Sequence, residues 1–271
     1  MKTRATTVEA VIFDWAGTLL DFGSRAPAMA FVELFRRNKM ELSVAEARGP
    51  MGTNKRDHIQ RLFDVPAIAK RWSRAHGRLP GSRDVDRLYK EFLPLQLRVL
   101  AAHSALVPGA KTTIAALRRK GIRVGSTTGY ARPMMAINLR EAARQGLKVD
   151  AVATADDVPA GRPAPHMCLK NALDLRVGAV GRCIKVDDTV PGIAEGLNAG
   201  MWTVGVSVTG NETGLSQAEW ARLPAAAKAR TRKAAERRLK RAGAHYVIDG
   251  VADLMAVVRD VERRLARGER P

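Results

Sequence analysis

The stretch that decides the fold of this chain is EAVIFDWAGTLLDFG, residues 9–23. Its apolar run 10–13 has the length and composition of a buried strand, and it ends at Asp14. A carboxylate in that position can attack phosphorus and form an acyl phosphate. Gly17 permits a tight turn after the strand, and the Thr18 hydroxyl can hydrogen-bond a phosphate oxygen. The aspartate could equally cap the next segment, and the motif alone leaves both interpretations open.

Further short apolar runs have the character of strands, and most of them end in small or acidic residues. They lie at residues 122–125, 151–153, 183–186, 202–206 and 246–248. Helical segments lie between them, such as 109–120 and 191–199, each followed by a glycine that can end a helix. This alternation predicts an α/β fold with a Rossmann-like parallel sheet covered by helices. Ligands bind at the carboxyl ends of the strands in such sheets.

One long segment interrupts the alternation directly after the first strand. Residues 22–103 have apolar residues at helical spacing and are punctuated by proline–glycine turns. We therefore predict three segments: core 1–21, a helical cap domain 22–103, and the remainder of the core, 104–271. A cap inserted there would lie over the strand ends and exclude water from the chemistry.

Other strand ends and loops carry residues that suit phosphate and a metal ion. Ser126 to Gly129 offers hydroxyls and flexible backbone amides for a phosphate. Arg162 supplies a cation on a loop that two prolines stiffen. Asp187 and Asp188 end a strand with carboxylates, the ligands that magnesium prefers. The order is that of a phosphoryl-transfer site: nucleophile, hydroxyls, cation and acidic pair.

The predicted cap contains one lysine that follows a proline–glycine turn, within PMGTNKRDH, residues 50–58. In a helix that begins near this turn, Lys55 and His58 share a face. A lysine amine can form a Schiff base with an aldehyde or ketone. It must be neutral to do so, whereas a free lysine has a pKa of about 10.4. Burial under the cap or a cation such as Arg56 could lower that pKa, although a surface lysine is the simpler interpretation.

Composition sets broader limits. The formal net charge is +19, and a dense basic stretch lies at residues 228–241. It is typical of a solvated helix face, and nucleic-acid contact is the less favoured interpretation because no aromatic residues interleave with the charges. Cys168 falls in a predicted helix and Cys183 in a predicted strand, both as core residues. The absence of a long apolar run predicts no membrane span, and a polar N-terminus favours the cytoplasm.

The core motifs resemble those of the haloacid dehalogenase superfamily of phosphoryl-transfer enzymes, over residues 8–20 and 106–248. The resemblance implies Asp14 as the nucleophile and Thr128 and Arg162 on the phosphoryl group. It also implies a Mg²⁺ ion held by Asp14, the Ala16 carbonyl and Asp188. Many phosphatases of this superfamily carry an aspartate as general acid where this chain has Ala16. An alanine cannot protonate a leaving group.

Nearly the whole chain, with the cap, resembles the phosphonoacetaldehyde hydrolase family of that superfamily. The matching stretches include EARGPMG before Lys55, GIRVGSTTGYARPMM, DDVPAGRPAPHMCLKNA and KVDDTVPGIAEGLNAGMWTVGV. The resemblance implies Lys55 as the Schiff-base lysine, with Met51, His58 and Tyr130 near it and Gly129 beside the phosphate. It further implies a homodimer, a phosphonate substrate, the products acetaldehyde and phosphate, and a place in 2-aminoethylphosphonate degradation.

Two positions depart from the family pattern. Gly192 stands where some members have an aspartate that supports magnesium through water. Asp187 could compensate, although strand alternation should direct it away from Asp188. Ser24 stands where some members have a cysteine, and we expect little effect.

Two alternatives stay open at this point. The chain could be a superfamily phosphatase or phosphomutase that acts on a phosphate ester, which Ala16 argues against. It could also be a non-catalytic nucleic-acid-binding relative, which the basic stretch 228–241 motivates.

Overall fold

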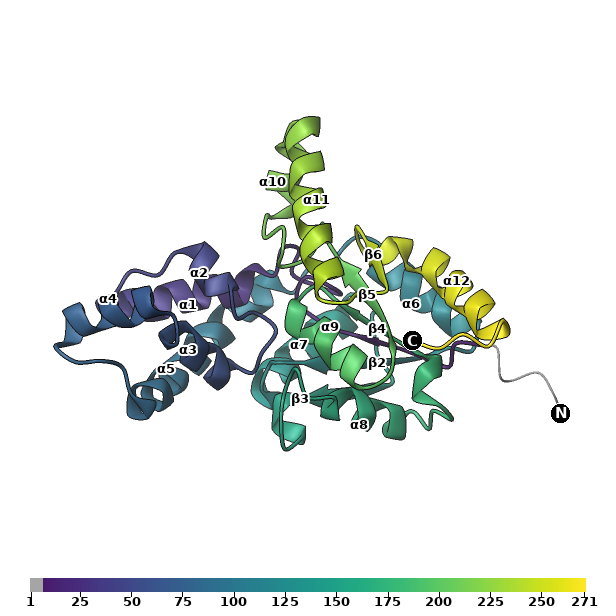
Figure 1. Cartoon of the computed structure of the whole chain (residues 1–271), viewed down its shortest axis with the longest axis horizontal. Coiled ribbons are helices and arrows are strands. Elements are labelled where there is room, and N and C mark those ends of the chain that lie inside the picture. The colour runs from purple at the N-terminus through teal and green to yellow at the C-terminus, as the bar shows by residue number, and fades with distance from the viewer. Residues whose placement is uncertain (1–6) are drawn as a thin grey trace.

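The computed structural model describes residues 7–271, so the first six residues of the predicted core segment lie outside the described part. The sheet has six parallel strands in the order β3-β2-β1-β4-β5-β6, which confirms the predicted α/β fold (Figure 1). The strands are β1 (Ala10–Phe13), β2 (Arg123–Thr128), β3 (Ala151–Thr154), β4 (Cys183–Asp187), β5 (Trp202–Val206) and β6 (Tyr246–Ile248).

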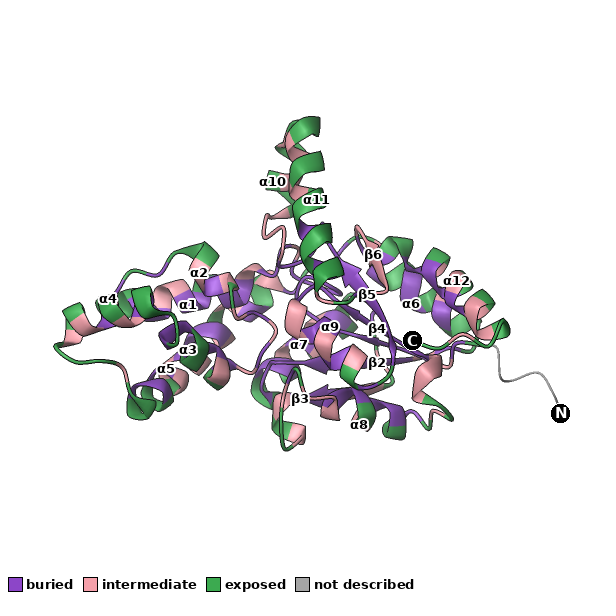
Figure 2. Ribbon diagram, viewed as in Figure 1, coloured by how far each residue is buried: buried purple, intermediate pink, exposed green. Residues whose placement is uncertain are grey.

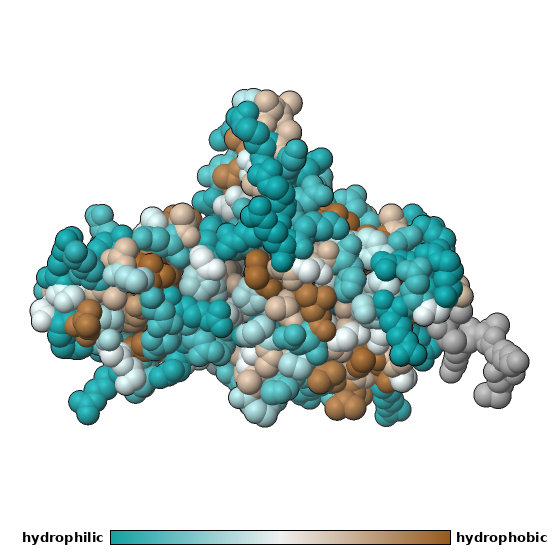
Figure 3. Space-filling model, viewed as in Figure 1, coloured by the Kyte–Doolittle hydropathy of each residue, from teal (hydrophilic) through white to brown (hydrophobic). Residues whose placement is uncertain are grey.

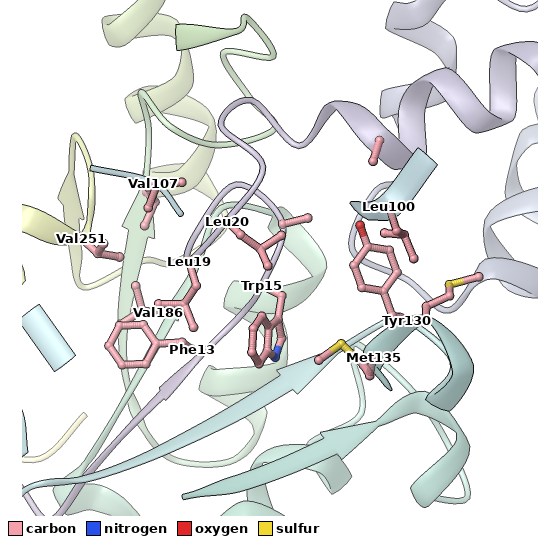
Figure 4. Close-up of a cluster of buried hydrophobic side chains, with 14 of the residues drawn as sticks. Phe13, Trp15, Leu19, Leu20, Leu100, Val107, Tyr130, Met135, Val186 and Val251 are labelled. Carbon is pink, nitrogen blue, oxygen red and sulfur yellow. The ribbon is translucent and has the colours of Figure 1, made fainter. Parts of the chain in front are cut away.

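Strand β1 lies in the middle of the sheet, between β2 and β4. Its side chains are buried on both faces, as a continuous apolar run requires in a parallel sheet. Val11 and Phe13 pack into one hydrophobic cluster, and Ala10 and Ile12 pack into a second. Figure 4 shows Phe13 beside Val186 and Leu19 in the first cluster. The central strand therefore fixes where its last carboxylate emerges.

Helices cover both faces of the sheet. On one face α8 (His166–Asp174), α9 (Val190–Asn198) and α11 (Ala225–Arg241) pack on the strands, and on the other α6 (Ala110–Arg119) packs on β2 with α12 (Leu254–Ala266) beside it. The helices predicted at 109–120 and 191–199 are thus confirmed as α6 and α9. Cys168 lies buried in α8 and Cys183 begins β4, as predicted, and neither forms a disulfide.

Strand β2 is longer than the sequence predicted. We expected it to end before Ser126, but pairing continues through Thr128. Ser126 pairs with Phe13 of β1 and Val152 of β3, so hydroxyl residues occupy a buried ladder. Their backbone groups need partners in the core, and the neighbouring strands supply them.

The insert between β1 and β2 is helical. It contains α1 (Arg25–Arg37), α2 (Val44–Arg48), α3 (Lys55–Phe63), α4 (Pro66–His76) and α5 (Ser82–Leu100), followed by the 3-10 turn Ala101–His103. Phe35, Phe63 and Trp72 make edge contacts with one another, and Phe31 stacks on Phe92 at 4.2 Å between ring centroids. The insert therefore has an aromatic core of its own and lies to one side of the sheet (Figure 1).

Besides the insert, α10 (Gln217–Arg222) and α11 also project from the sheet, at the top of the molecule (Figure 1). The basic stretch 228–241 lies in α11, where Ala235 and Leu239 are the buried residues (Figure 2). Its visible surface is mostly hydrophilic (Figure 3). This fits a solvated helix, and nucleic-acid contact stays an untested prediction. Over residues 7–271, no helix combines the length and apolar character that crossing a bilayer requires.

The remaining core helix, α7 (Arg132–Arg144), begins shortly after β2 and packs against α5 of the insert. Insert and core thus contact each other at the carboxyl end of the sheet, where β1 and β2 end. The polar residues of the sequence motifs lie there.

Candidate active site

A pocket with an empty volume of about 290 Å³ lies between the strand ends and the insert. Most of the predicted site residues line it: Asp14, Ala16, Met51, Lys55, Thr128, Gly129, Tyr130 and Arg162. Ser24, Pro27, Gly52 and Thr189 complete the lining. Residues from the core and from the insert therefore meet in one small enclosure.

Three predicted site residues lie behind this lining. Thr18 is fully buried, and its hydroxyl donates to Asp188 Oδ1 at 3.4 Å. Asp188 also accepts the backbone N–H of Asn211 at 2.7 Å. His58 is buried within the insert. Thr18 therefore orients a carboxylate in this structure rather than facing the pocket.

Asp14, Asp187 and Asp188 bring carboxylate oxygens within 4.8 Å of one another. The expectation that strand alternation separates Asp187 from Asp188 is wrong. The strand ends at Asp187, and the chain bends at Asp188, so the alternation stops before it can separate them. Two glycines leave room for Asp188: a Cβ on Gly17 would lie 2.1 Å from Asp188 Oδ2, and one on Gly210 would lie 2.4 Å from its Cβ.

Arg162 links these acids to a further carboxylate. Its Nη2 lies 2.9 Å from Asp14 Oδ1 and 3.2 Å from Asp187 Oδ2, and its Nε lies 2.8 Å from Glu195 Oε2. All these side chains are buried. Buried charges need partners, and Arg162 offers a planar fork that can serve several carboxylates at once.

Sequence reasoning missed a second buried cation, Lys185 in the middle of β4. Its Nζ donates to Thr127 Oγ1 at 2.6 Å and lies 3.0 Å from Asp187 Oδ2 and 3.4 Å from Glu195 Oε2. The Thr127 hydroxyl also donates to Glu195 at 3.0 Å. The available signal was a lysine within an otherwise apolar strand, CIKVD, because an unpaired lysine is almost never fully buried.

The charges of this network fit a divalent cation. Four buried carboxylates (Asp14, Asp187, Asp188 and Glu195) face the buried cations Arg162 and Lys185, which leaves two excess negative charges when Lys55, the third buried base of the site, is neutral.

The titration of the acids agrees with that fit. Burial and the charges of Asp14 and Asp187 raise the pKa of Asp188 well above its ordinary value. Burial and Asp187 raise the pKa of Asp14 to about 6, against the opposing effect of Arg162 and Lys185. A dication at the three aspartates would stabilise their ionised forms, and oxygen ligands suit Mg²⁺.

Lys55 reaches the pocket from the start of α3. Asn54 caps this helix by accepting the backbone N–H of Asp57, which fixes where the helix begins. Burial, with a contribution from Arg162, lowers the pKa of Lys55 to about 8, although Asp14 opposes the change. Arg56 is not the responsible cation, since it points outward and pairs with Asp86 at 2.7 Å.

Tyr130 and His58 surround Lys55. The Lys55 Nζ lies 5.0 Å from the centroid of the buried Tyr130 ring. The His58 ring stacks on Phe31 at 3.8 Å, and its Nε2 lies 2.9 Å from the Ala47 carbonyl oxygen. Burial and the charge of Lys55 lower the pKa of His58 well below its ordinary value, so this imidazole is neutral near pH 7.

The loop that delivers Lys55 rests on the core through close backbone contacts. A Cβ on Gly52 would lie 2.3 Å from Thr189 Oγ1, and one on Gly129 would lie 2.5 Å from the Thr53 carbonyl oxygen. Neither position has space for a side chain. Both glycines thus let the insert and the core approach closely enough to close the pocket.

Comparison with known proteins agrees with this arrangement. Residues 8–200 match the family model described as haloacid dehalogenase-like hydrolase. A phosphonoacetaldehyde hydrolase of Hahella chejuensis is 50% identical over 264 residues, which cover 97% of this chain and 90% of that protein. One of Bordetella pertussis is 46% identical over 271 residues, covering 100% and 98%.

A solved structure agrees over the whole length. The crystal structure of a phosphonoacetaldehyde hydrolase-like protein from Oleispira antarctica superposes with a TM-score of 0.97 at 51% identity, covering 100% of this chain and 99% of that one. Fold, pocket and near-complete coverage point the same way: the chain belongs to the phosphonoacetaldehyde hydrolase family of the haloacid dehalogenase-like hydrolases.

Proposed function

We propose that this protein hydrolyses the carbon–phosphorus bond of phosphonoacetaldehyde to acetaldehyde and phosphate. The observation that carries the proposal is that Asp14 of the core and Lys55 of the insert line the same buried pocket. Asp14 can attack the phosphorus of a small substrate, and Lys55 can attack its carbonyl carbon. The names of the relatives at 46–50% identity support the same substrate.

In the proposed sequence of steps, the neutral Lys55 amine adds to the aldehyde, and the adduct takes up a proton and loses water, which gives a protonated imine. The Asp14 carboxylate then attacks phosphorus, and the carbon–phosphorus bond breaks. Its electron pair moves into the imine, so that an enamine forms on Lys55 and an acyl phosphate on Asp14. Water hydrolyses both, releasing acetaldehyde and phosphate and restoring the two side chains.

The other lining residues have supporting roles in this proposal. Arg162 and Thr128, with the Gly129 amide, would hold the phosphonate oxygens, and Met51 would pack against the substrate. A Mg²⁺ ion held by Asp14, the Ala16 carbonyl and Asp188 would neutralise charge on those oxygens. Tyr130 and the neutral His58 would move protons around the imine.

Ala16 favours this reaction over ester hydrolysis. It lines the pocket, and by the family resemblance it occupies the position from which an acid would protonate an alkoxide. The titratable residues of the described lining are Asp14, Lys55, Tyr130 and Arg162. Besides the nucleophile Asp14, none of them is a carboxylic acid. The imine removes the need for one, because it accepts the electrons that the breaking bond releases. A phosphatase or phosphomutase acting on esters is therefore the second candidate.

Two further parts of the proposal rest on the family resemblance, a homodimer and a place in 2-aminoethylphosphonate breakdown, and a cytoplasmic location rests on the polar N-terminus. The aldehyde substrate itself implies a preceding step that converts an amine or alcohol to the aldehyde.

Borohydride should trap the imine on Lys55. Reduction during turnover of phosphonoacetaldehyde is expected to leave a stable adduct on the peptide that contains Lys55, detected by mass spectrometry. Lys55→Arg should lose the adduct and at least about a thousandfold in kcat, because a guanidinium forms no imine. Lys70→Arg, an exposed lysine of the same insert, is the control and should keep both. An adduct that persists in Lys55→Arg would rule out this lysine.

The rate should follow the titration of Lys55. Because attack needs the neutral amine, kcat/KM is expected to rise with pH through about 8 and to level off above it. Arg56→Gln should leave this midpoint unchanged, since Arg56 pairs outward with Asp86. A midpoint near 10, the ordinary lysine value, would contradict a buried nucleophilic lysine.

A substrate panel separates the two candidate functions. Phosphate release from phosphonoacetaldehyde should exceed release from small phosphate esters at least about a hundredfold, the lower range of what a general acid contributes. Lys55→Arg should abolish the first activity and leave any ester hydrolysis unaffected. Faster ester hydrolysis would favour the phosphatase.

Gly129→Ala tests whether close contact of the insert delivers Lys55. The new Cβ would meet the Thr53 carbonyl oxygen at 2.5 Å, so the loop must shift. We expect a loss of about 10- to 100-fold in kcat/KM with little change in melting temperature, because small displacements of catalytic groups are costly. The control is Gly81→Ala, another glycine of the insert with open space around its Cβ position. Equal losses in both variants would contradict the role of the Gly129 contact in delivering Lys55.

A further inference from the structure

Arg48 is the half-buried last residue of α2, and it precedes Lys55 by one short turn of chain. Its guanidinium forms no ion pair within residues 7–271, and its hydrogen-bond partners there are carbonyl and amide oxygens. A guanidinium offers five donors in a fixed planar fork, so it can hold several neutral oxygens at set directions. The contacts of Arg48 therefore show which parts of the chain it joins.

The guanidinium of Arg48 joins three segments. Its Nη1 donates to the Gly23 carbonyl oxygen at 2.8 Å and to Asn211 Oδ1 at 3.1 Å, and its Nη2 donates to the Gly214 carbonyl oxygen at 3.0 Å. Gly23 and Ser24 form the bend by which the chain enters the insert, with left-handed φ angles of 84° and 48°. Asn211 and Gly214 belong to a core loop after β5. One side chain thus ties α2 and the entry bend to the core.

The core loop is shaped around this guanidinium at Gly214. The φ angle of Gly214 is +68°, and a Cβ there would lie 2.8 Å from Arg48 Nε and 2.9 Å from its Cζ. A side chain at position 214 and the guanidinium cannot occupy this space together. The loop therefore accepts Arg48 only with glycine at this position.

Both ends of the contact lead to the active-site pocket. On the core side, the backbone N–H of Asn211 donates to Asp188 Oδ2 at 2.7 Å. On the insert side, the Arg48 carbonyl oxygen accepts the backbone N–H of Met51 at 3.1 Å, and the turn continues to Lys55 at the start of α3. Arg48 therefore fixes the loop that carries Lys55 relative to the core loop that contacts Asp188.

We propose that Arg48 is a positioning residue, which holds the insert on the core loop 209–214 and thereby places Lys55 in one pocket with Asp14. It touches neither the substrate nor the reacting atoms. A second arginine of the insert, Arg25, also reaches the core and pairs with Glu219, but both of these side chains are partly exposed. Exposed ion pairs contribute little, so the half-buried Arg48 carries the positioning. The kinetic part of this inference rests on the proposed function.

Arg48→Ala should lower kcat for phosphonoacetaldehyde about 10- to 100-fold, because small displacements of a catalytic group are costly. KM should change less than about threefold, since Arg162 and Thr128 remain to hold the phosphonate. Guanidinium at a concentration that does not denature the protein should restore kcat at least about threefold, whereas methylammonium, which donates from a single nitrogen, should not. Arg25→Ala is the matched control, an arginine at the same boundary, and should lose less than about threefold.

Hydrogen–deuterium exchange measures the same contact without substrate. Arg48→Ala should speed amide exchange in residues 49–55 and 209–214, and Arg25→Ala should leave both segments unchanged. Gly214→Ala should reproduce the effect of Arg48→Ala with the arginine intact, because its Cβ displaces the guanidinium. Gly121→Ala is its control, a core glycine with a similar φ of +74° and open space around the Cβ position. The melting temperature of each variant reports folding separately.

The outcomes separate this role from the proposed function. A wild type that releases no acetaldehyde and phosphate from phosphonoacetaldehyde overturns the proposed function, and the exchange measurement then decides on the contact alone. Unchanged exchange in Arg48→Ala overturns the contact. Faster exchange with an unchanged kcat overturns the positioning of Lys55 and leaves the proposed function intact. Equal losses in Arg25→Ala, or a loss of kcat that guanidinium does not rescue, assign Arg48 a general stabilising role and also overturn the proposal.

Discussion

The contact of Arg162 with three carboxylates is the interaction on which the rest of the site depends. Asp14, Asp187 and Glu195 come from three separate elements, and each would repel the others in a buried setting. A single guanidinium serves all three because it offers several donors in one plane. Lys185 shares two of these carboxylates: its Nζ pairs with Asp187 and Glu195, and it also donates to the Thr127 hydroxyl. Even so, the acids outnumber the cations by two once Asp188 is included. This excess of acids is compatible with a divalent cation at the three aspartates.

The position of the insert depends on a different constraint, which is how closely its backbone can approach the backbone of the core. Gly52 and Gly129 lie where a Cβ would collide with the opposite loop, so the insert and the core meet main chain to main chain. Arg48 of the insert adds a polar contact across the same boundary, donating to the carbonyl oxygen of Gly214 at 3.0 Å. These contacts fix the start of α3, and with it the direction in which Lys55 enters the pocket. Positioning of this kind is what phosphoryl transfer chiefly requires.

Much of this could be predicted from the sequence, and the physical reasons for success and failure differ by residue. Asp14, Thr128 and Asp188 were predicted because carboxyl ends of parallel strands converge, a rule that needs no knowledge of side-chain contacts. Lys185 was missed because its partners lie far along the chain, at Thr127 and Glu195, and local patterns do not show them. The error on Asp187 came from applying strand alternation one residue past the end of β4.

Thr18 illustrates a further limit of prediction from sequence. Its residue type suits both a phosphate and a carboxylate partner, and only the fold decides between them. In the structure the turn at Gly17 directs the Thr18 hydroxyl toward Asp188. The family roles of Lys55, His58 and Tyr130 remain predictions, although the structure places all three in one buried group.

In the proposed mechanism, docking of the insert and activation of Lys55 would be one physical event. An exposed lysine has a pKa of about 10.4 and is protonated near pH 7, so it is no nucleophile. Burial is the largest cause of the lower pKa of Lys55, about 8, and the contacts at Gly52 and Gly129 enclose the pocket that buries it. Arg162 adds to the lowering from the core side. With the loop displaced, both contributions would weaken, the pKa of Lys55 would rise and the neutral fraction of its amine would fall. In the proposed mechanism, the lysine would therefore be most nucleophilic in the same arrangement that places it in one pocket with Asp14.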